Sequence, residues 1–312
     1  MPKHSRQPAV LTRLTGRFAP SPSGPLHFGS LVAGLASYCQ AKSQQGDWLL
    51  RIEDVDTPRV VAGASDQILR DLEAFGFEWD GAVSYQSEGF EKYKHYLDKL
   101  LDKKDCYPCE CSRRTLREQG VPSGPLGQIY PGNCRAKQLS LENHSIRLNT
   151  GHAQWIKFVD RVYGEFALNL SESVGDFVLR RADNIYSYHL AVVVDDELQN
   201  ITEVVRGADL LENTCLHIYL QQKLGFKTPD YMHIPLVNNA QGVKLSKQTG
   251  ANALDHRNPS RQLFAALGHL GQSPQPQLEN AGPREILQWA VDNWSIVSIP
   301  VERAAVAETF ET

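Results

Sequence analysis

The fold is decided by residues 17–30, Arg-Phe-Ala-Pro-Ser-Pro-Ser-Gly-Pro-Leu-His-Phe-Gly-Ser, where a loop too rich in proline to be helical separates a strand from a helix. Apolar and β-branched residues predict the strand over Leu11–Phe18, and apolar residues at helical spacing predict the helix over Gly29–Gln45. A second strand is predicted at Trp48–Glu53. These elements make one βαβ unit, which is typical of a parallel sheet.

Strands and helices continue to alternate on both sides of an irregular segment. Residues 106–151 form that segment, and their Gly, Pro, Cys and polar residues predict an insert. We therefore expect an α/β fold, a doubly wound parallel sheet split by this insert. The predicted helices lie around residues 68–75, 93–101 and 210–224, and the predicted strands at residues 155–159, 176–179, 201–205 and 232–237.

The composition is that of an ordinary globular protein. Hydrophobic residues make up 41% of the 312, and no segment has the roughly 18 consecutive apolar residues that a membrane span needs. The N-terminal residues lack the apolar stretch of a secretory signal, so we expect a soluble cytoplasmic protein without a membrane partner. A net charge of −4 argues against nonspecific coating of nucleic acid, so such a partner would need a local basic patch.

The start of the predicted helix has the features of a phosphate-binding site. Free backbone N–H groups and the helix dipole favour anions at a helix N-terminus. Gly29 lets the backbone approach a nucleotide closely, and His27 is placed to donate to phosphates as charge builds in a transition state. The alternative interpretation is an ordinary proline-rich turn with a surface histidine.

A second cationic segment, Gly242-Val-Lys244-Leu-Ser-Lys247-Gln, lies in the other half of the chain. Alone, two lysines at this spacing are usually a solvated surface. Beside a phosphate site they gain a role, because a mobile ammonium group can neutralise charge on a leaving pyrophosphate.

Together, His27-Phe-Gly29-Ser30 and Lys244-Leu-Ser-Lys247-Gln resemble the two nucleotide motifs of class I aminoacyl-tRNA synthetases. Residues 17–24, 51–56 and 205–214 resemble the glutamyl branch of that class, so the resemblance runs from about Thr15 to Gln248. It implies a ligase with a Rossmann-type catalytic domain, which uses ATP and Mg²⁺ to activate L-glutamate as an acyl-adenylate. The catalytic residues that it implies are His27, Lys244 and Lys247, and the ATP-binding residues are Pro20, Ser21, His27, Gly29, Ser30 and Lys247.

The same resemblance implies the residues that bind L-glutamate. Arginine suits planar, bidentate recognition of carboxylates, and the resemblance assigns one carboxylate to Arg17 and the side-chain carboxylate to Arg206. Glu53 and Tyr188 are implied to close on the amino end, although a strand-end salt bridge with a neighbouring arginine is the alternative for Glu53. The full implied set is Arg17, Ala19, Ser21, Glu53, Tyr188 and Arg206.

Four of the six cysteines lie between Cys106 and Cys134, with the close pairing and distant return of a tetrahedral zinc site. Spacing alone nominates four thiolates, from Cys106, Cys109, Cys111 and Cys134. The resemblance instead implies Cys109, Cys111, Tyr130 and Cys134 as the Zn²⁺ ligands, and we expect this set, with Cys106 as a neighbour. Scattered reduced thiols are the remaining alternative.

These inferences divide the chain into four parts. They are the first half of the catalytic domain (residues 1–105), a zinc-binding insert (106–151), the second half with the lysine segment (152–255) and a C-terminal helical region (256–312).

The length after the lysine segment bears on the acceptor. Glutamyl-tRNA synthetases continue into helical domains that read the anticodon, whereas about 65 residues follow here, so we expect no anticodon-binding domain. The chain thus resembles the short paralogue of that family, which implies transfer of glutamate by a monomer to the queuosine base at the wobble position of tRNA(Asp). Three alternatives stay open: a truncated synthetase that charges the 3′ end of tRNA(Glu), a non-catalytic tRNA-binding regulatory paralogue, and a nucleotidyltransferase that makes a small-molecule adenylate.

Overall fold

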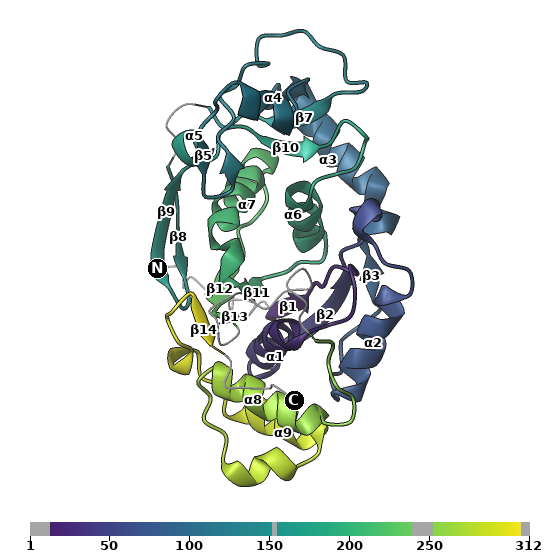
Figure 1. Ribbon diagram of the computed structural model, residues 1–312, viewed down its shortest axis with the longest axis vertical. Helices are drawn as coiled ribbons and strands as arrows, with labels where there is room; N and C mark the ends of the chain where they lie inside the picture. The colour runs from purple at the N-terminus through teal and green to yellow at the C-terminus, as the bar shows by residue number, and fades with distance from the viewer. Residues whose placement is uncertain (1–12, 152–154, 239–251, 307–312) are drawn as a thin grey trace, which may run out of the picture.

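Two groups of parallel strands meet in the middle of the computed structural model, which describes residues 13–151, 155–238 and 252–306 (Figure 1). The first group contains β1 (Thr15–Phe18), β2 (Asp47–Ile52) and β3 (Ser84–Tyr85), in that order. The second contains β11 (Glu203–Gly207) beside β12 (Asp230–Ile234). The backbone N–H of Thr202 donates to the carbonyl oxygen of Thr15 (2.9 Å), which places β11 next to β1.

The resulting order, β3-β2-β1-β11-β12, has a switch point between β1 and β11. The chain leaves β1 toward β2 on one side, and it continues from β11 toward β12 on the other. At such a point the loops part, and a crevice opens outside the carboxyl ends of the strands. The doubly wound α/β sheet expected from the sequence is therefore confirmed.

One hydrophobic core lies below the first group of strands. It joins α1 (Phe28–Lys42) and α2 (Ala64–Ala74) to the C-terminal helices α8 (Pro259–His269) and α9 (Pro283–Asp292), and Trp48 and Phe75 are buried within it. In Figure 1, α8 and α9 lie beside α1. The C-terminal helices therefore complete the core on which the loop between β1 and α1 rests.

A second core lies on the other side of the switch point. It is built by α3 (Phe90–Asp102), α6 (Tyr188–Leu198) and α7 (Leu211–Leu224), which pack against an antiparallel sheet of order β10-β7-β4. The strands of that sheet are β4 (Cys106–Cys109), β7 (Ser145–Leu148) and β10 (Phe177–Arg180).

The prediction that residues 176–179 continue the parallel sheet is wrong, because they belong to β10, which pairs antiparallel with β7. A period-two pattern identifies a strand but not its partner, so the sequence could not place it. The sheet thus combines two strands of the predicted insert with one strand from beyond residue 152. The four-part division of the chain stays a prediction.

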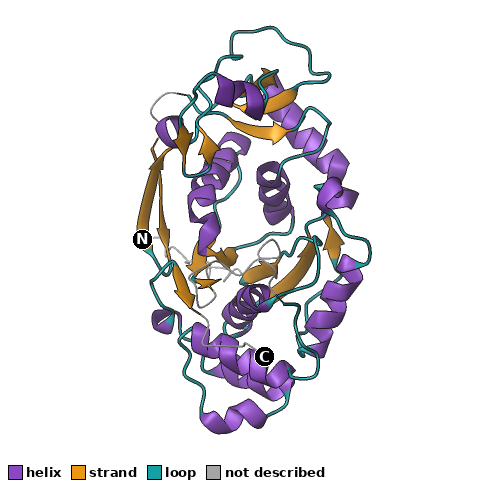
Figure 2. Cartoon of the chain, in the orientation of Figure 1, coloured by secondary structure: helices purple, strands orange, loops and turns teal. Residues whose placement is uncertain are grey.

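Loops make up most of the predicted insert, at the top of the view in Figure 2. A hairpin of β8 (Trp155–Asp160) and β9 (Gly164–Asn169) extends the second parallel group, since Asp160 of β8 pairs with Tyr231 of β12. Among the described residues no helix is long and apolar enough to cross a membrane. The remaining elements are α4 (Arg113–Glu118), α5 (Leu170–Ser173), β5 (Ser123–Gly124), β6 (Gly127–Gln128), β13 (Leu236–Asn238) and β14 (Ala304–Val306), with 3₁₀ turns at Thr57–Arg59, Gln86–Gly89, Ala208–Leu210, Pro276–Asn280 and Ile296–Ser298.

Candidate active site

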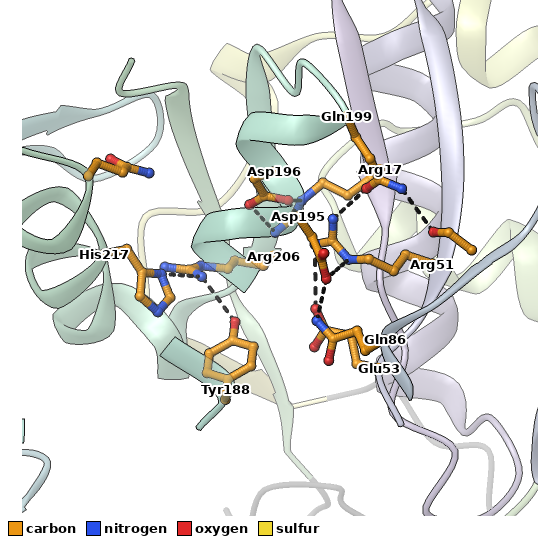
Figure 3. Close-up of polar contacts among 12 residues, drawn as sticks. Arg17, Arg51, Glu53, Gln86, Tyr188, Asp195, Asp196, Gln199, Arg206 and His217 are labelled. Carbon is orange, nitrogen blue, oxygen red and sulfur yellow. Dashed lines mark hydrogen bonds and ion pairs between the residues drawn. The ribbon is translucent and has the colours of Figure 1, made fainter. Parts of the chain in front are cut away.

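A buried ion network joins the two halves of the fold at the switch point (Figure 3). Asp196 of α6 accepts from Arg17 Nε at 3.1 Å and from Arg51 Nη2 at 2.7 Å. Burial alone would raise the pKa of Asp196, but the two guanidinium groups outweigh it and hold that pKa below its usual range. The carboxylate of Asp196 therefore stays charged and fixes Arg17 of β1 against α6.

The neighbouring Asp195 extends this network. Its carboxylate lies 2.6 Å from Lys92 Nζ and accepts from Tyr93 Oη at 2.8 Å and from Gln86 Nε2 at 2.9 Å. Sequence reasoning missed both aspartates. The available signal was a pair of acids at the end of the apolar run Leu190–Val194, because acids in such a helix are buried only when cations meet them.

Glu53 follows the carboxyl end of β2 and faces the same network. Its Oε1 lies 3.5 Å from Arg51 Nη2, so the alternative salt bridge foreseen for this residue is present at long distance. Burial raises the pKa of Glu53 to about 7, although Arg51 and Arg17 act in the opposite direction. Near neutral pH its carboxyl group is therefore poised between the protonated and charged forms.

Tyr188 and Arg206 form a second polar group. Arg206 Nη1 donates to the Tyr188 hydroxyl at 3.2 Å, and Figure 3 shows the Tyr188 ring pointing toward Arg206. Burial raises the pKa of Tyr188; the charges of Arg206 and Arg17 oppose the rise and that of Glu53 adds to it. The charges of Arg206, Arg17 and Glu53 thus all act on the Tyr188 hydroxyl. The structure therefore brings together these four residues, which were predicted to bind glutamate.

The loop between β1 and α1 presents the predicted phosphate site. His27 is the N-cap of α1, and its Nδ1 accepts from the backbone N–H of Ser30 at 3.3 Å. The proton of a neutral His27 ring therefore lies on Nε2. Gly29 and Ser30 occupy the first turn of α1, so their N–H groups belong to its positive end.

Neighbouring segments hold this loop in place. The backbone N–H of Leu26 donates to Asp71 Oδ2 (3.3 Å), and the N–H of Leu254 donates to the carbonyl oxygen of Leu26 (3.1 Å). The carbonyl of Pro20 accepts from the N–H of Glu53 at 3.0 Å, which ties the loop to the end of β2. The other predicted members of this loop are Ala19, directly after β1, and the exposed Ser21, whereas Lys244 and Lys247 lie outside the described residues.

Three thiols gather in the predicted insert and could hold a metal ion. The sulfur atoms of Cys109, Cys111 and Cys134 all lie within 4.8 Å of one another. The Tyr130 hydroxyl joins them, 3.1 Å from Cys109 Sγ and 3.6 Å from Cys111 Sγ. Cys106 is packed instead in the second hydrophobic core and is not part of this group.

The Tyr130 side chain reaches this group because its backbone lies against a glycine. Gly175 has a φ of +68°, and a Cβ there would meet the backbone of Tyr130. Arg147 packs over the Tyr130 ring, with its guanidinium 3.9 Å from the ring centroid and its Nε 3.2 Å from Cys109 Sγ. Three thiols and a phenol at these distances suit a tetrahedral, four-ligand site.

Residues 13–288 match the family model for the catalytic domain of tRNA synthetases class I (E and Q). The chain belongs to this family. It is therefore a ligase of the class I synthetase type.

Individual relatives agree with the family. The chain is 47% identical over 289 residues to the glutamyl-Q tRNA(Asp) synthetase of Photobacterium profundum, which covers 93% of this chain and 91% of that protein. It is 44% identical over 299 residues to the protein of the same name from Escherichia coli, covering 96% and 94%. Among solved structures, the glutamate-tRNA synthetase of Elizabethkingia anophelis superposes with a TM-score of 0.78 at 27% identity, covering 94% of this chain and 68% of that one.

The first prediction concerns the ion network. Replacing Asp196 by Asn leaves two buried guanidinium groups without their shared carboxylate, so we expect a loss of about 3–5 kcal/mol in the free energy of unfolding, measured by urea titration. The matched control is Asp183→Asn, since Asp183 pairs with Arg181 at the half-exposed surface and its loss should cost less than about 1 kcal/mol. Equal losses in the two variants would show that the network does not hold the halves together.

Proposed function

We propose that this enzyme activates L-glutamate with ATP and transfers the glutamyl group to the queuosine base at the wobble position of tRNA(Asp). One observation carries the choice of amino acid: the Arg206 guanidinium is buried beside Tyr188, and no carboxylate of the described residues forms an ion pair with it. A buried cation of this kind calls for an anionic ligand, which a glutamate side chain supplies. The acceptor is supported by the names of relatives that are 44–47% identical.

The polar groups around Tyr188 fit the three charged groups of glutamate. Arg17 uses Nε and Nη2 for Asp196, and no acceptor among the described residues meets its Nη1, which we assign to the α-carboxylate. Glu53 in its charged form receives the ammonium group. We assign the side-chain carboxylate to Arg206 and also to Tyr188, because the Tyr188 hydroxyl accepts from Arg206 at 3.2 Å, although the resemblance implied the amino end for Tyr188. This assignment directs the α-carboxylate toward the β1–α1 loop.

The reaction that follows from this placement is in-line attack of the α-carboxylate on the α-phosphorus of ATP, with pyrophosphate as the leaving group. His27 Nε2–H and the N-terminus of α1 stabilise the charge that builds on the phosphate oxygens. Bound Mg²⁺ would neutralise phosphate charge, and Lys244 and Lys247 are assigned to the leaving pyrophosphate. A nucleophilic group of the acceptor base then displaces AMP from the acyl carbon.

We assign Zn²⁺ to the thiol group of the insert, with Cys109, Cys111, Tyr130 and Cys134 as ligands. Sulfur ligands select zinc over magnesium or calcium, and four-coordinate zinc sites without an open position are structural. The site would therefore fold the insert and take no part in the chemistry. We further assign the enzyme to the cytoplasm, where ATP and tRNA are available, and we expect it to be a monomer.

The pH dependence of glutamate binding tests the role of Glu53. Its pKa in the free enzyme is about 7, and only the charged form pairs with an ammonium group, so glutamate should bind about tenfold more tightly at pH 8 than at pH 6. Binding would in turn lower the pKa of Glu53. The measurement is the apparent KM for glutamate in ATP–pyrophosphate exchange across this range. In Glu53→Gln the affinity should be weak and flat with pH, and an unchanged pH profile in that variant would assign the titration to another group.

Zinc content tests the ligand set. Purified protein should hold one zinc ion per chain, which Cys109→Ser and Cys134→Ser lose and Cys106→Ser keeps, as measured by metal analysis after gel filtration. Cys106→Ser is the matched control because it removes a buried thiol of the same region without touching the group. Loss of zinc from the Cys106 variant would favour four thiolates in place of Tyr130.

Transfer of labelled glutamate tests the acceptor. We expect labelling of tRNA(Asp) from cells that make queuosine and none of tRNA(Asp) from cells that cannot. The label should stay on the tRNA after the 3′-terminal adenosine is removed, because it is attached to the wobble base. Label found only on the terminal adenosine of tRNA(Glu) would identify a truncated glutamyl-tRNA synthetase, and absence of any glutamate-dependent exchange would identify a non-catalytic paralogue.

A further inference from the structure

The surroundings of Arg206 account for every one of its hydrogen-bond donors. A guanidinium group on a side chain has five N–H bonds, and the described residues offer five acceptors within 3.3 Å. These acceptors are His233 Nε2 for Nε (3.1 Å), the Tyr188 hydroxyl and His217 Nδ1 for Nη1 (both 3.2 Å), and the Leu210 carbonyl and Thr214 Oγ1 for Nη2 (3.3 and 2.8 Å). All five acceptors are formally uncharged groups or imidazoles.

A contact with Asp160 sets the orientation of the His233 ring. His233 Nδ1 lies 2.6 Å from Asp160 Oδ2, so Nδ1 carries the proton and Nε2 presents a lone pair to Arg206. Asp160 is itself held by the backbone N–H groups of Val162 and Tyr163, both at 3.0 Å. The imidazole ring of His233 therefore separates the Asp160 carboxylate from Arg206.

A pair of histidines, His217 and His189, lies on another side of Arg206. His217 Nδ1 accepts from Arg206, so its Nε2 carries the proton that His189 Nδ1 accepts at 3.2 Å. Burial and the charge of Arg206 lower the pKa of His189 to about 4, and they lower the pKa of His217 well below its ordinary value. Both rings are uncharged at neutral pH.

This arrangement differs from that of the other buried arginines of the site. Arg17 and Arg51 share the carboxylate of Asp196, which offsets their charge. Arg206 has its hydrogen bonds satisfied, and no carboxylate within the described part of the chain forms an ion pair with it. Hydrogen bonding orients the guanidinium, while the remaining charge attracts an anion and gives no comparable advantage to an amide.

We propose that His217 is a specificity-determining positioning residue, which holds Arg206 through an acceptor without negative charge and so preserves the preference for glutamate over glutamine. The proposal rests on the function proposed above, because it concerns the same side-chain carboxylate. Tyr188 connects Arg206 to the ligand. Its oxygen accepts from Arg206, so its own hydroxyl proton points away from Arg206 and can be donated to the ligand. His217 acts through Arg206 and does not itself touch the substrate.

Two substitutions of nearly equal shape test the role of charge. His217→Asn and His217→Asp both place an oxygen acceptor near the position of His217 Nδ1, and they differ in the charge that they bring beside Arg206. The measurements are kcat and KM for glutamate, for glutamine and for ATP in pyrophosphate exchange. We expect His217→Asn to keep the preference for glutamate within about tenfold, and His217→Asp to raise the KM for glutamate by about 100-fold or more while glutamine activation stays or improves.

The KM for ATP serves as the control for the fold, since the ATP site lies on the β1–α1 loop. It should be the same in both variants. Thr214→Asn and Thr214→Asp give a second matched pair, because Thr214 accepts from the other terminal nitrogen of Arg206 and the same dependence on charge is expected there.

The outcomes separate the inference from the proposed function. If the wild-type enzyme activates glutamate but the Asp and Asn variants have the same selectivity at both positions, the neutral surroundings of Arg206 do not determine specificity and the inference is wrong. If the wild-type enzyme shows no glutamate-dependent exchange, the proposed function itself fails. An equal loss of selectivity in Asn and Asp variants would assign His217 a purely structural role.

Discussion

The Asp196 carboxylate is the constraint on which the site depends. It projects from α6, in the second hydrophobic core, and binds arginines of β1 and β2, which belong to the first. Arg17 forms no ion pair with a described residue of its own half, and Arg51 meets Glu53 there only at 3.5 Å. A cation buried without an anion costs several kcal/mol. The ion pairs therefore favour one relative placement of the two halves, and that placement positions Arg17 and Glu53 opposite Tyr188.

The site contains two kinds of buried arginine with different consequences. Where a carboxylate accompanies the guanidinium, as with Asp196, the charge is neutralised within the protein and the side chain serves mainly to hold elements together. Where imidazoles, a phenol and a carbonyl accompany it, as at Arg206, the geometry is fixed without neutralising the charge. A buried cation without a carboxylate beside it destabilises the free protein, and in the function proposed above the glutamate side chain would provide the anion.

The group of three thiols and the Tyr130 hydroxyl shows how segments far apart in the sequence come together. Cys109 and Cys111 lie at the end of β4 and just beyond it, whereas Tyr130 and Cys134 come from a later loop that is held by a contact with Gly175. Only glycine permits the backbones to approach there, because a Cβ at residue 175 would overlap the Tyr130 main chain. The insert is thus anchored to residues beyond its predicted boundary, as β10 is through its pairing with β7.

The sequence by itself determined the fold class, the helix that starts at the phosphate loop and the family, because these depend on local periodicity and on contiguous motifs such as His27-Phe-Gly29-Ser30. It also nominated Arg17, Glu53, Tyr188 and Arg206. Only the tertiary structure decided which charges are paired: Asp196 lies 179 positions from Arg17, and His233 lies 27 positions from Arg206. No local pattern encodes such pairs, since burial and the choice of partner arise when separate elements pack together. These two factors determine which buried arginines pair with a carboxylate of the protein and which one has only uncharged acceptors.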